Sequence, residues 1–76
     1  MTPIKELLDK IKWDSKQKKE EYKIGYWDRI KGKETRINYE QIKSYDNQFF
    51  EVGESEIPLH RIKRVYKKGK LIWERK

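Results

Sequence analysis

Cysteine is absent from this 76-residue sequence, and histidine occurs only once. Without cysteine the chain has no disulfide framework, no thiolate metal site and no cysteine nucleophile. A single histidine excludes a two-histidine phosphoesterase site or a histidine-rich metal centre within one chain. The four glycines are scattered and form no phosphate-binding loop. A protein that is not an enzyme and that needs no metal or cofactor is therefore expected.

Long apolar runs are missing too. No stretch of about 18 apolar residues occurs, and the first residues lack the basic and apolar regions of a signal peptide. A cytoplasmic protein with no membrane partner is expected, with one domain over residues 1–76. Charged residues, mainly lysine and glutamate, make up 43% of the chain. This bias is typical of heat-adapted proteins with surface ion-pair networks, so a thermostable protein is expected.

The positive charge is concentrated at the C-terminal end. The net charge is +7, and residues 59–76 hold eight Lys and Arg against one acidic residue, whereas residues 44–58 hold four acidic residues and no Lys or Arg. Tyr66 and Trp73 stand among the C-terminal cations, a combination that can attract phosphate and stack on bases. Nucleic acid is therefore the leading partner class. The alternative is that the lysines only solvate a small domain.

An N-terminal helix is predicted over residues 3–12. Thr2 and Pro3 suit its first turn, and four apolar residues recur at helical spacing. They are Ile4, Leu7, Leu8 and Ile11. Trp13 is expected to close the core at the helix end, and the polar residues 16–21 to form an exposed connection.

A first hairpin follows the helix. Alternation predicts a strand over residues 22–30, with Asp28 and Ile30 on the same face as its apolar residues. A tight turn at residues 31–32 then returns the chain into an antiparallel strand, residues 33–37.

The middle of the chain has weaker signals. Asn38 and Gln41 resemble a capping box, which predicts one helical turn over residues 39–43 before Asp46 and Asn47 break the chain. A short strand is predicted over residues 48–52, ended by the glycine and the polar residues that follow it.

A second hairpin is predicted at the C-terminal end. Pro58 precedes a strand over residues 59–66, and Lys68 and Gly69 turn the chain back. A two-residue loop predicts pairs between Lys67 and Lys70, Val65 and Ile72, Arg64 and Trp73, Lys63 and Glu74, and Ile62 and Arg75. The predicted fold class is α+β, with an N-terminal helix packed on a small antiparallel β-sheet built from two hairpins.

Several side chains that can donate hydrogen bonds to phosphate lie near the predicted strand ends. They are Arg29 beside Asp28, His60 with Arg61 after Pro58, and Arg75 beside Trp73. A guanidinium can give two parallel hydrogen bonds to phosphate, and an imidazole adds one directional donor. The alternative for each is structural, because Asp28 and Arg29 could pair across the sheet and His60 could bond a backbone carbonyl.

His60 and Arg61 are adjacent, which sets a condition on their joint role. In a regular strand their side chains would leave on opposite faces and could not hold one phosphate. Joint binding requires irregular backbone that becomes extended only at Ile62. His60 is the preferred ligand contact.

Two stretches carry a family resemblance. They are YKIGYWDR, residues 22–29, and IPLHRI, residues 57–62, the latter followed by Gly69 and Trp73-Glu74-Arg75; the Trp13-Asp14 pair also fits. Over nearly the whole chain the sequence resembles the small, mainly archaeal family of RNA cyclic group end recognition domains. The matching positions are Asp28, Arg29, His60, Arg61 and Arg75, with Trp13 and Trp73 as aromatic matches.

The resemblance implies binding of RNA termini that carry a 2′,3′-cyclic phosphate or a similarly processed group. It also implies an RNA ligase or a phosphodiesterase acting in trans. Two alternatives stay open: a non-catalytic adaptor that docks on a larger RNA-processing protein, and a weak RNA-end phosphodiesterase. A Trp or Tyr within reach of two arginines would favour RNA, whereas exposed aromatic residues without nearby cations would favour the adaptor.

Overall fold

The computed structural model describes residues 3–13 and 18–75. Its one α-helix is α1 (Ile4–Trp13) in that part of the chain. The strands are β1 (Tyr22–Asp28), β2 (Lys33–Asn38), β3 (Ile42–Tyr45), β4 (Phe49–Val52), β5 (Ser55–Pro58), β6 (Ile62–Lys67) and β7 (Lys70–Glu74). Three short 3-10 turns separate some of them: η1 (Lys19–Glu21), η2 (Tyr39–Gln41) and η3 (Leu59–Arg61).

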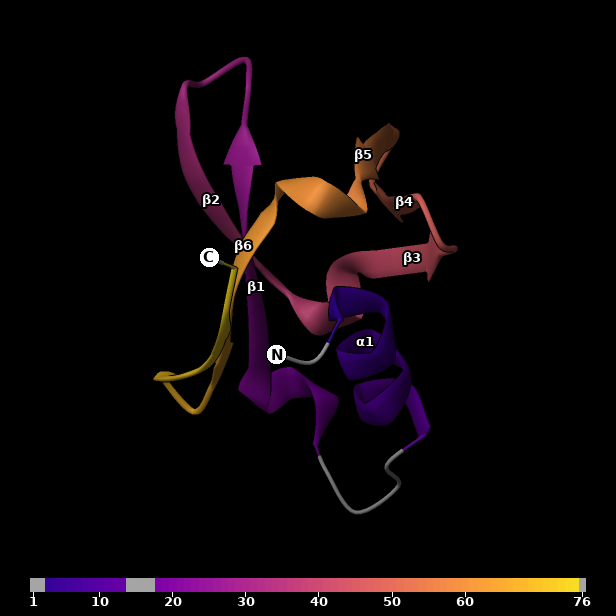
Figure 1. Cartoon of the computed structure of the whole chain (residues 1–76), viewed down its shortest axis with the longest axis vertical. Helices are drawn as coiled ribbons and strands as arrows, with labels where there is room; N and C mark the ends of the chain where they lie inside the picture. The colour runs from indigo at the N-terminus through magenta and orange to yellow at the C-terminus, as the bar shows by residue number, and fades with distance from the viewer. Residues whose placement is uncertain (1–2, 14–17, 76) are drawn as a thin grey trace.

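The strands form two antiparallel sheets (Figure 1). The β1–β2 and β6–β7 hairpins make a four-stranded sheet in the order β2-β1-β6-β7, and β3, β4 and β5 make a second sheet in chain order. The α+β class, with a helix and a sheet built from two hairpins, is confirmed; the second sheet is an addition. Among the residues that the structure describes, no helix has the length and apolar character needed to span a bilayer.

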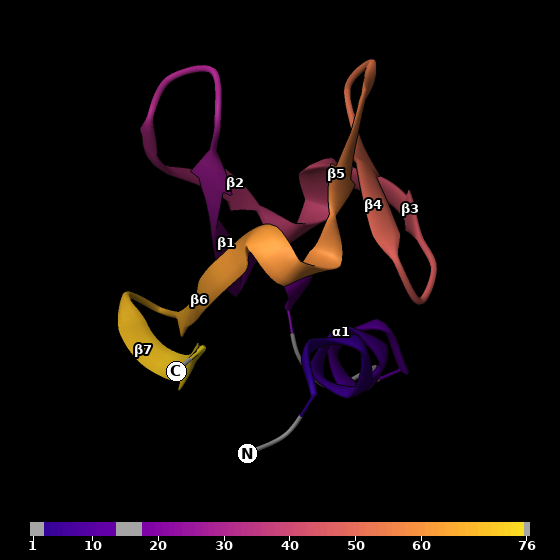
Figure 2. The same ribbon diagram turned by 45° about the horizontal axis from the view of Figure 1, so that its top comes forward.

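One buried cluster serves the helix and both sheets. Its least exposed members are Leu8 and Ile11 of α1, Ile24 of β1, Phe50 of β4, and Ile62 and Val65 of β6. Figure 2 shows the two sheets side by side, with α1 below them in that view. The edge of Phe50 meets the Tyr26 ring, with centroids 5.7 Å apart, so the second sheet packs directly on the first.

Two tyrosine hydroxyls fasten α1 to the rest of the fold. Tyr39 donates a hydrogen bond to the carbonyl of Leu8 at 3.2 Å, and Tyr45 donates one to Asp9 Oδ1 at 2.7 Å. Lys5 Nζ lies 2.9 Å from the other oxygen of the same carboxylate. Hydrogen bonds depend on direction, so these contacts fix the orientation of α1 more specifically than apolar packing alone.

The predicted helix is confirmed, but the expectation that Trp13 closes the core is wrong. The indole is 76% exposed, with Lys12 Nζ 5.4 Å from its ring centroid. Two residues along a helix correspond to about 200°, so Trp13 points away from the face that buries Ile11. The expected Thr2 cap lies outside the described residues.

β1 ends earlier than predicted, at Asp28. Asp28 Oδ1 accepts hydrogen bonds from the backbone N–H of Ile30 at 2.9 Å and of Lys31 at 3.1 Å. This Asx turn bends the chain, and Ile30 is 98% exposed instead of facing the core. The loop spans residues 29–32 and is completed by Gly32 at φ +65°.

The second sheet was largely missed by the sequence analysis. β4 and the η2 turn are confirmed, and the backbone N–H of Asn38 donates to Gln41 Oε1 at 2.9 Å as a capping box requires. Residues 42–45 and 55–58 form strands that were not predicted. Each has four residues and few buried side chains, so its alternation is too short to be recognised in sequence.

The C-terminal hairpin keeps its predicted turn but changes its pairing. Lys67 pairs with Lys70 around Lys68 and Gly69, which have φ values of +51° and +83°. A bulge then shifts the register, so Val65 pairs with Trp73 and Arg64 with Glu74. The four other predicted pairs are wrong, and the strand that was expected from residue 59 starts at residue 62 after η3.

The bulge has a packing reason. It leaves Ile72 44% exposed and turns Trp73 inward, where the indole is only 7% exposed. The indole has more apolar surface than the isoleucine side chain, so burying Trp73 is the more favourable choice for this small core.

We expect Trp73→Ala to lower the free energy of unfolding by about 3 to 5 kcal/mol, because it removes a buried aromatic side chain. Ile72→Ala is the matched control and should change stability by about 0.5 kcal/mol or less. Chemical denaturation of both variants tests this. Similar losses for the two would contradict the bulged register.

We expect Asp9 to contribute to stability at neutral pH and to stop doing so in acid. The hydrogen bonds from Tyr45 and Lys5 hold the pKa of Asp9 below its usual value of 3.8 in the folded protein. The contribution is therefore complete above about pH 4 and is lost as the pH falls through the lowered pKa. An NMR titration of Tyr45→Phe should show the pKa of Asp9 moved back towards 3.8; an unchanged value would show that the tyrosine is not the cause.

Candidate nucleic-acid interface

The four-stranded sheet has one face that points away from the core. β1 buries Ile24 and Tyr26, so its alternate residues point outward, and the pairing extends this face over the neighbouring strands. The outward residues are Lys23, Gly25 and Trp27 of β1, Glu34, Arg36 and Asn38 of β2, Arg64 and Tyr66 of β6, and Leu71, Ile72 and Glu74 of β7. We call this set the outer sheet face.

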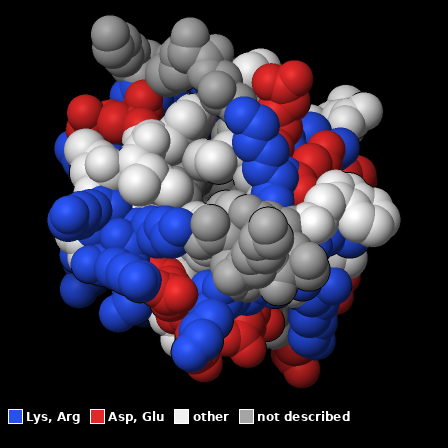
Figure 3. Space-filling model, turned by 90° about the horizontal axis from the view of Figure 1, so that it is seen from below, with Lys and Arg blue, Asp and Glu red and all other residues white. Residues whose placement is uncertain are grey.

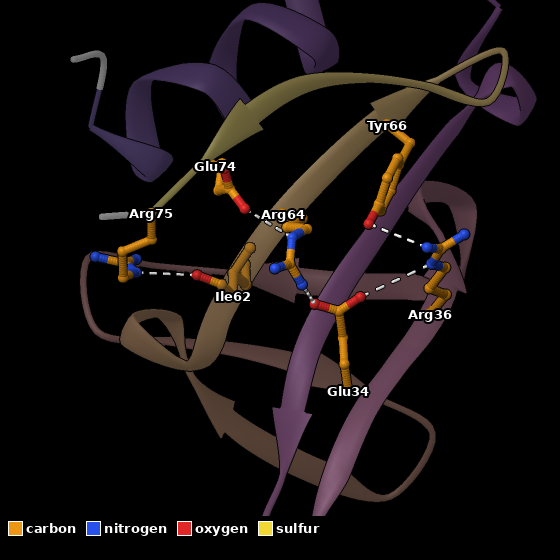
Figure 4. Close-up of polar contacts among 7 residues, drawn as sticks. All are labelled: Glu34, Arg36, Ile62, Arg64, Tyr66, Glu74 and Arg75. Atoms are coloured by element: carbon orange, nitrogen blue, oxygen red, sulfur yellow. Dashed lines mark hydrogen bonds and ion pairs between the residues drawn. The ribbon is translucent and has the colours of Figure 1, made fainter.

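Ion pairs on the outer sheet face join β2, β6 and β7, and one of them passes over β1 (Figure 4). Glu34 accepts a hydrogen bond from Arg64 Nη1, and its other carboxylate oxygen lies 3.8 Å from Arg36 Nε. Arg64 Nε donates to Glu74 Oε2 at 2.9 Å. The carboxylates of Glu74 and Glu34 raise the pKa of Arg64. Arg64 is therefore committed to holding the sheet together.

Gly25 allows Glu34 to make this connection. Glu34 is on β2 and Arg64 is on β6, so the Glu34 side chain has to cross β1 to reach Arg64. On β1, Gly25 pairs with Arg36 of β2 and with Arg64 of β6. A Cβ atom on Gly25 would lie 3.1 Å from Glu34 Cδ and Oε2, closer than an ordinary van der Waals contact. The absent side chain leaves the space that the carboxylate fills.

Tyr66 lies beside two arginines on the outer sheet face. The guanidinium carbon of Arg36 is 4.2 Å from the Tyr66 ring centroid, and Arg36 Nη2 donates to the Tyr66 hydroxyl at 3.1 Å. Arg64 precedes Tyr66 by two residues on the same face of β6. The prediction for RNA asks for two arginines within reach of a Trp or Tyr: Arg36 contacts Tyr66, whereas Arg64 is paired with Glu34 and Glu74. Trp27, 43% exposed, adds a second aromatic ring to the face.

The η3 turn brings three of the predicted phosphate ligands together. The irregular backbone required for joint binding is present, because His60 and Arg61 lie in a 3-10 turn and the strand starts at Ile62. Arg75 Nε donates to the carbonyl of Ile62 at 2.9 Å, and Arg75 Nη2 donates to that of Leu59 at 3.2 Å. We call His60, Arg61 and Arg75 the η3 corner.

The surroundings of the η3 corner differ for its three members. His60 is exposed and borders a shallow hollow, whereas Arg61 and Arg75 are half-buried. The hollow is also lined by Asn47, Gln48, Phe49, Pro58 and Leu59. The Arg75 guanidinium carbon lies 5.2 Å from the ring centroid of the buried Trp73, which supports the arginine from below.

The other predicted site residues lie elsewhere. Asp28 uses a carboxylate oxygen to cap the β1–β2 loop, and Arg29 is exposed on that loop. Trp13 is exposed at the end of α1, and Trp73 belongs to the core. Sequence reasoning did not single out Trp27, Arg36 and Arg64; the alternation of β1 and the hairpin pairing of β2 were the available signals.

Cations also gather at the β6–β7 turn. Lys67, Lys68 and Lys70 surround it, and Lys68 Nζ lies 3.2 Å from Glu21 Oε2. Figure 3 shows Lys and Arg side chains gathered towards the left, where Figure 1 places this turn. Within residues 3–13 and 18–75, no cluster of three or more His, Asp or Glu side chains could hold a metal ion.

Comparison with known proteins yields one family model and several archaeal relatives. The model of the MJ1316 RNA cyclic group end recognition domain matches residues 1–75. UPF0248 protein TK0315 of Thermococcus kodakarensis is 47% identical over 75 residues, covering 96% of this chain and 91% of that protein. A UPF0248 protein of Metallosphaera sedula is 33% identical over 73 residues, with 95% and 91% covered. No solved structure matches the chain significantly.

We expect the effect of Gly25→Ala to depend on Glu34. In a Glu34→Ala background the substitution should be neutral or stabilising by up to about 1 kcal/mol, because alanine is favoured over glycine in a strand. With Glu34 present, the added methyl group displaces the carboxylate and should make the substitution less favourable by about 0.5 to 1 kcal/mol. Unfolding free energies of the four proteins measure this coupling; equal effects in both backgrounds would show that Gly25 does not hold the Glu34 path open.

Proposed function

The chain belongs to the MJ1316 RNA cyclic group end recognition domain family, and we propose that it binds RNA termini carrying a 2′,3′-cyclic phosphate or a similarly processed group. The observation that carries the proposal is the η3 corner. There His60 and Arg61 share one irregular turn, and Arg75 is held against that turn by two backbone carbonyls.

The chemistry of the ligand fits these donors. A 2′,3′-cyclic phosphate has one negative charge and two non-bridging oxygens, and its terminal ribose has no free 2′-hydroxyl to donate. A guanidinium has five N–H donors, and the carbonyls of Leu59 and Ile62 use two of them on Arg75. An arginine positioned before binding loses less conformational entropy when it meets phosphate. Arg75 therefore supplies a fixed donor and His60 an exposed directional one.

The same residues support binding rather than catalysis. Cleavage of a cyclic phosphate by acid–base chemistry needs a general base and a general acid on opposite sides of the phosphorus, and this chain has one histidine. The name of the family also describes recognition. We therefore propose a non-catalytic module whose bound end is processed by an RNA ligase or phosphodiesterase acting in trans.

We expect His60→Ala to weaken binding of an RNA ending in a 2′,3′-cyclic phosphate by about 1 to 3 kcal/mol, through one lost charge-assisted hydrogen bond. Binding of the same RNA with a 3′-hydroxyl should change little, and the unfolding free energy should stay constant because His60 is exposed. Fluorescence or calorimetric titrations of a short RNA with cyclic phosphate, 3′-phosphate and 3′-hydroxyl ends measure the effect.

Lys43→Ala is the matched control, since Lys43 is an exposed residue on β3 of the other sheet. It should lower the affinity for all three ends equally or not at all. If His60→Ala lowers the affinity for all three RNA ends equally, His60 contributes only general attraction to phosphate. Loss of folding would make it a structural histidine, and the site assignment would then be wrong.

A further inference from the structure

The outer sheet face has features that end recognition alone does not use. Trp27 exposes 43% of its surface there, although a small core depends on burying its few bulky side chains. The guanidinium carbon of Arg36 lies 4.2 Å from the Tyr66 ring centroid, while the Arg36 side chain remains 59% exposed. The exposed layer of this stack is therefore a planar cation.

We propose that the outer sheet face binds the nucleotides that precede the RNA end, by stacking bases on Trp27 and on the Arg36–Tyr66 pair. The proposal rests on the proposed function of the η3 corner and extends it from the terminal group to the strand. Bases of single-stranded RNA stack on aromatic rings and on guanidinium planes, whatever their sequence.

Some cations on this face are paired with carboxylates of the protein, and others can interact with a ligand. Arg64 is held by both Glu34 and Glu74, so its charge is largely compensated. Arg36 has only a 3.8 Å contact with Glu34, and Lys23 is exposed across the sheet from Tyr66. Both of these cations lie at the Tyr66 position, where they can meet the phosphates of a base stacked there, whereas Trp27 lies opposite Glu34.

The spacing suits a strand rather than a single nucleotide. Tyr66 lies opposite Lys23, and Trp27 lies four residues further along β1. Four residues of a β-strand span roughly 13 Å, so the two stacking positions cannot hold the same base. An RNA strand that crosses the sheet would place different nucleotides on them.

The outer sheet face ends at Glu74, beside the η3 corner. The ion pairs lead from Arg36 through Glu34 and Arg64 to Glu74, and Arg75, the next residue, bonds the η3 turn. Figure 4 shows these side chains following one another across the strands. A terminal phosphate at Arg75 would therefore leave the preceding nucleotides over the sheet.

The cations and aromatic rings of this face favour RNA over a protein as its partner. The Tyr66 ring is bordered by Arg36 and Lys23, and the chain carries a net charge of +7. Such a surface is complementary to a polyanion with stacking bases and less so to an apolar protein surface. We therefore assign single-stranded RNA as the occupant.

The test compares a hexanucleotide ending in a 2′,3′-cyclic phosphate with a single nucleoside 2′,3′-cyclic phosphate. We expect Trp27→Ala to weaken binding of the hexanucleotide roughly tenfold and to leave the mononucleotide unchanged, because only the longer ligand reaches the outer sheet face. Trp27→Phe keeps an aromatic ring and should retain most of the affinity. Lys43→Ala, at an exposed residue on β3 of the other sheet, should affect both ligands equally or not at all.

A second variant tests the stacked cation without changing the charge. Arg36→Lys keeps one positive charge but loses the planar guanidinium, so it should weaken hexanucleotide binding several-fold with an unchanged salt dependence. Circular dichroism and thermal melting of each variant establish that the fold is retained before binding is compared.

The outcomes separate the two proposals. If Trp27→Ala and Arg36→Lys fold normally and bind the hexanucleotide as the natural chain does, the stacking surface is wrong while end recognition can stand. If both weaken the hexanucleotide but the natural chain does not distinguish a cyclic phosphate from a 3′-hydroxyl, the stacking surface stands and end recognition fails. Absence of RNA binding by the natural chain would overturn both and leave a protein as the occupant of the face.

Discussion

Burial of Trp73 is the constraint on which the geometry of the η3 corner depends. The core is built from few bulky side chains, and an exposed indole would remove one of its largest contributions. The bulge at Ile72 brings Trp73 inside, and the same one-residue shift places Glu74 opposite Arg64 and lets Arg75 reach the η3 turn. The packing of one aromatic residue thereby sets the positions of the charged residues that follow it.

Charge is used in two ways on the four-stranded sheet. Arg64 and Glu34 join strands that are distant in sequence, and the missing side chain of Gly25 leaves the path between them open. Arg36 and His60 are exposed, and Arg36 has a single carboxylate neighbour at 3.8 Å, so their charge or donors are less compensated than those of Arg64. A basic composition therefore overstates the number of cations that a ligand can use, because several already neutralise carboxylates.

Elements with a long, clear period were predictable from the sequence, and short ones were not. The helix follows from helical spacing, the β1–β2 hairpin from alternation along β1, and the β6–β7 hairpin from β-branched residues and the Lys68-Gly69 turn. β3 and β5 have four residues each and bury too few of them to show a period. Trp13 lies outside the core because its angle on the helix turns the indole away from the buried face, and size and apolar character alone do not give that angle.

The sequence by itself determined the chemistry that is available: no thiol, one histidine, a basic C-terminal end and the identity of the donors near the strand ends. Local patterns also determined most of the elements. Tertiary structure decided which donors meet. Arg75 reaches η3, and Glu34 reaches Arg64, only after a bulge and a strand crossing that depend on how side-chain volumes fill one small core. Alternation repeats every two residues and can be recognised locally. Strand register depends on how the whole core packs, so a one-residue shift cannot be recognised from the local sequence.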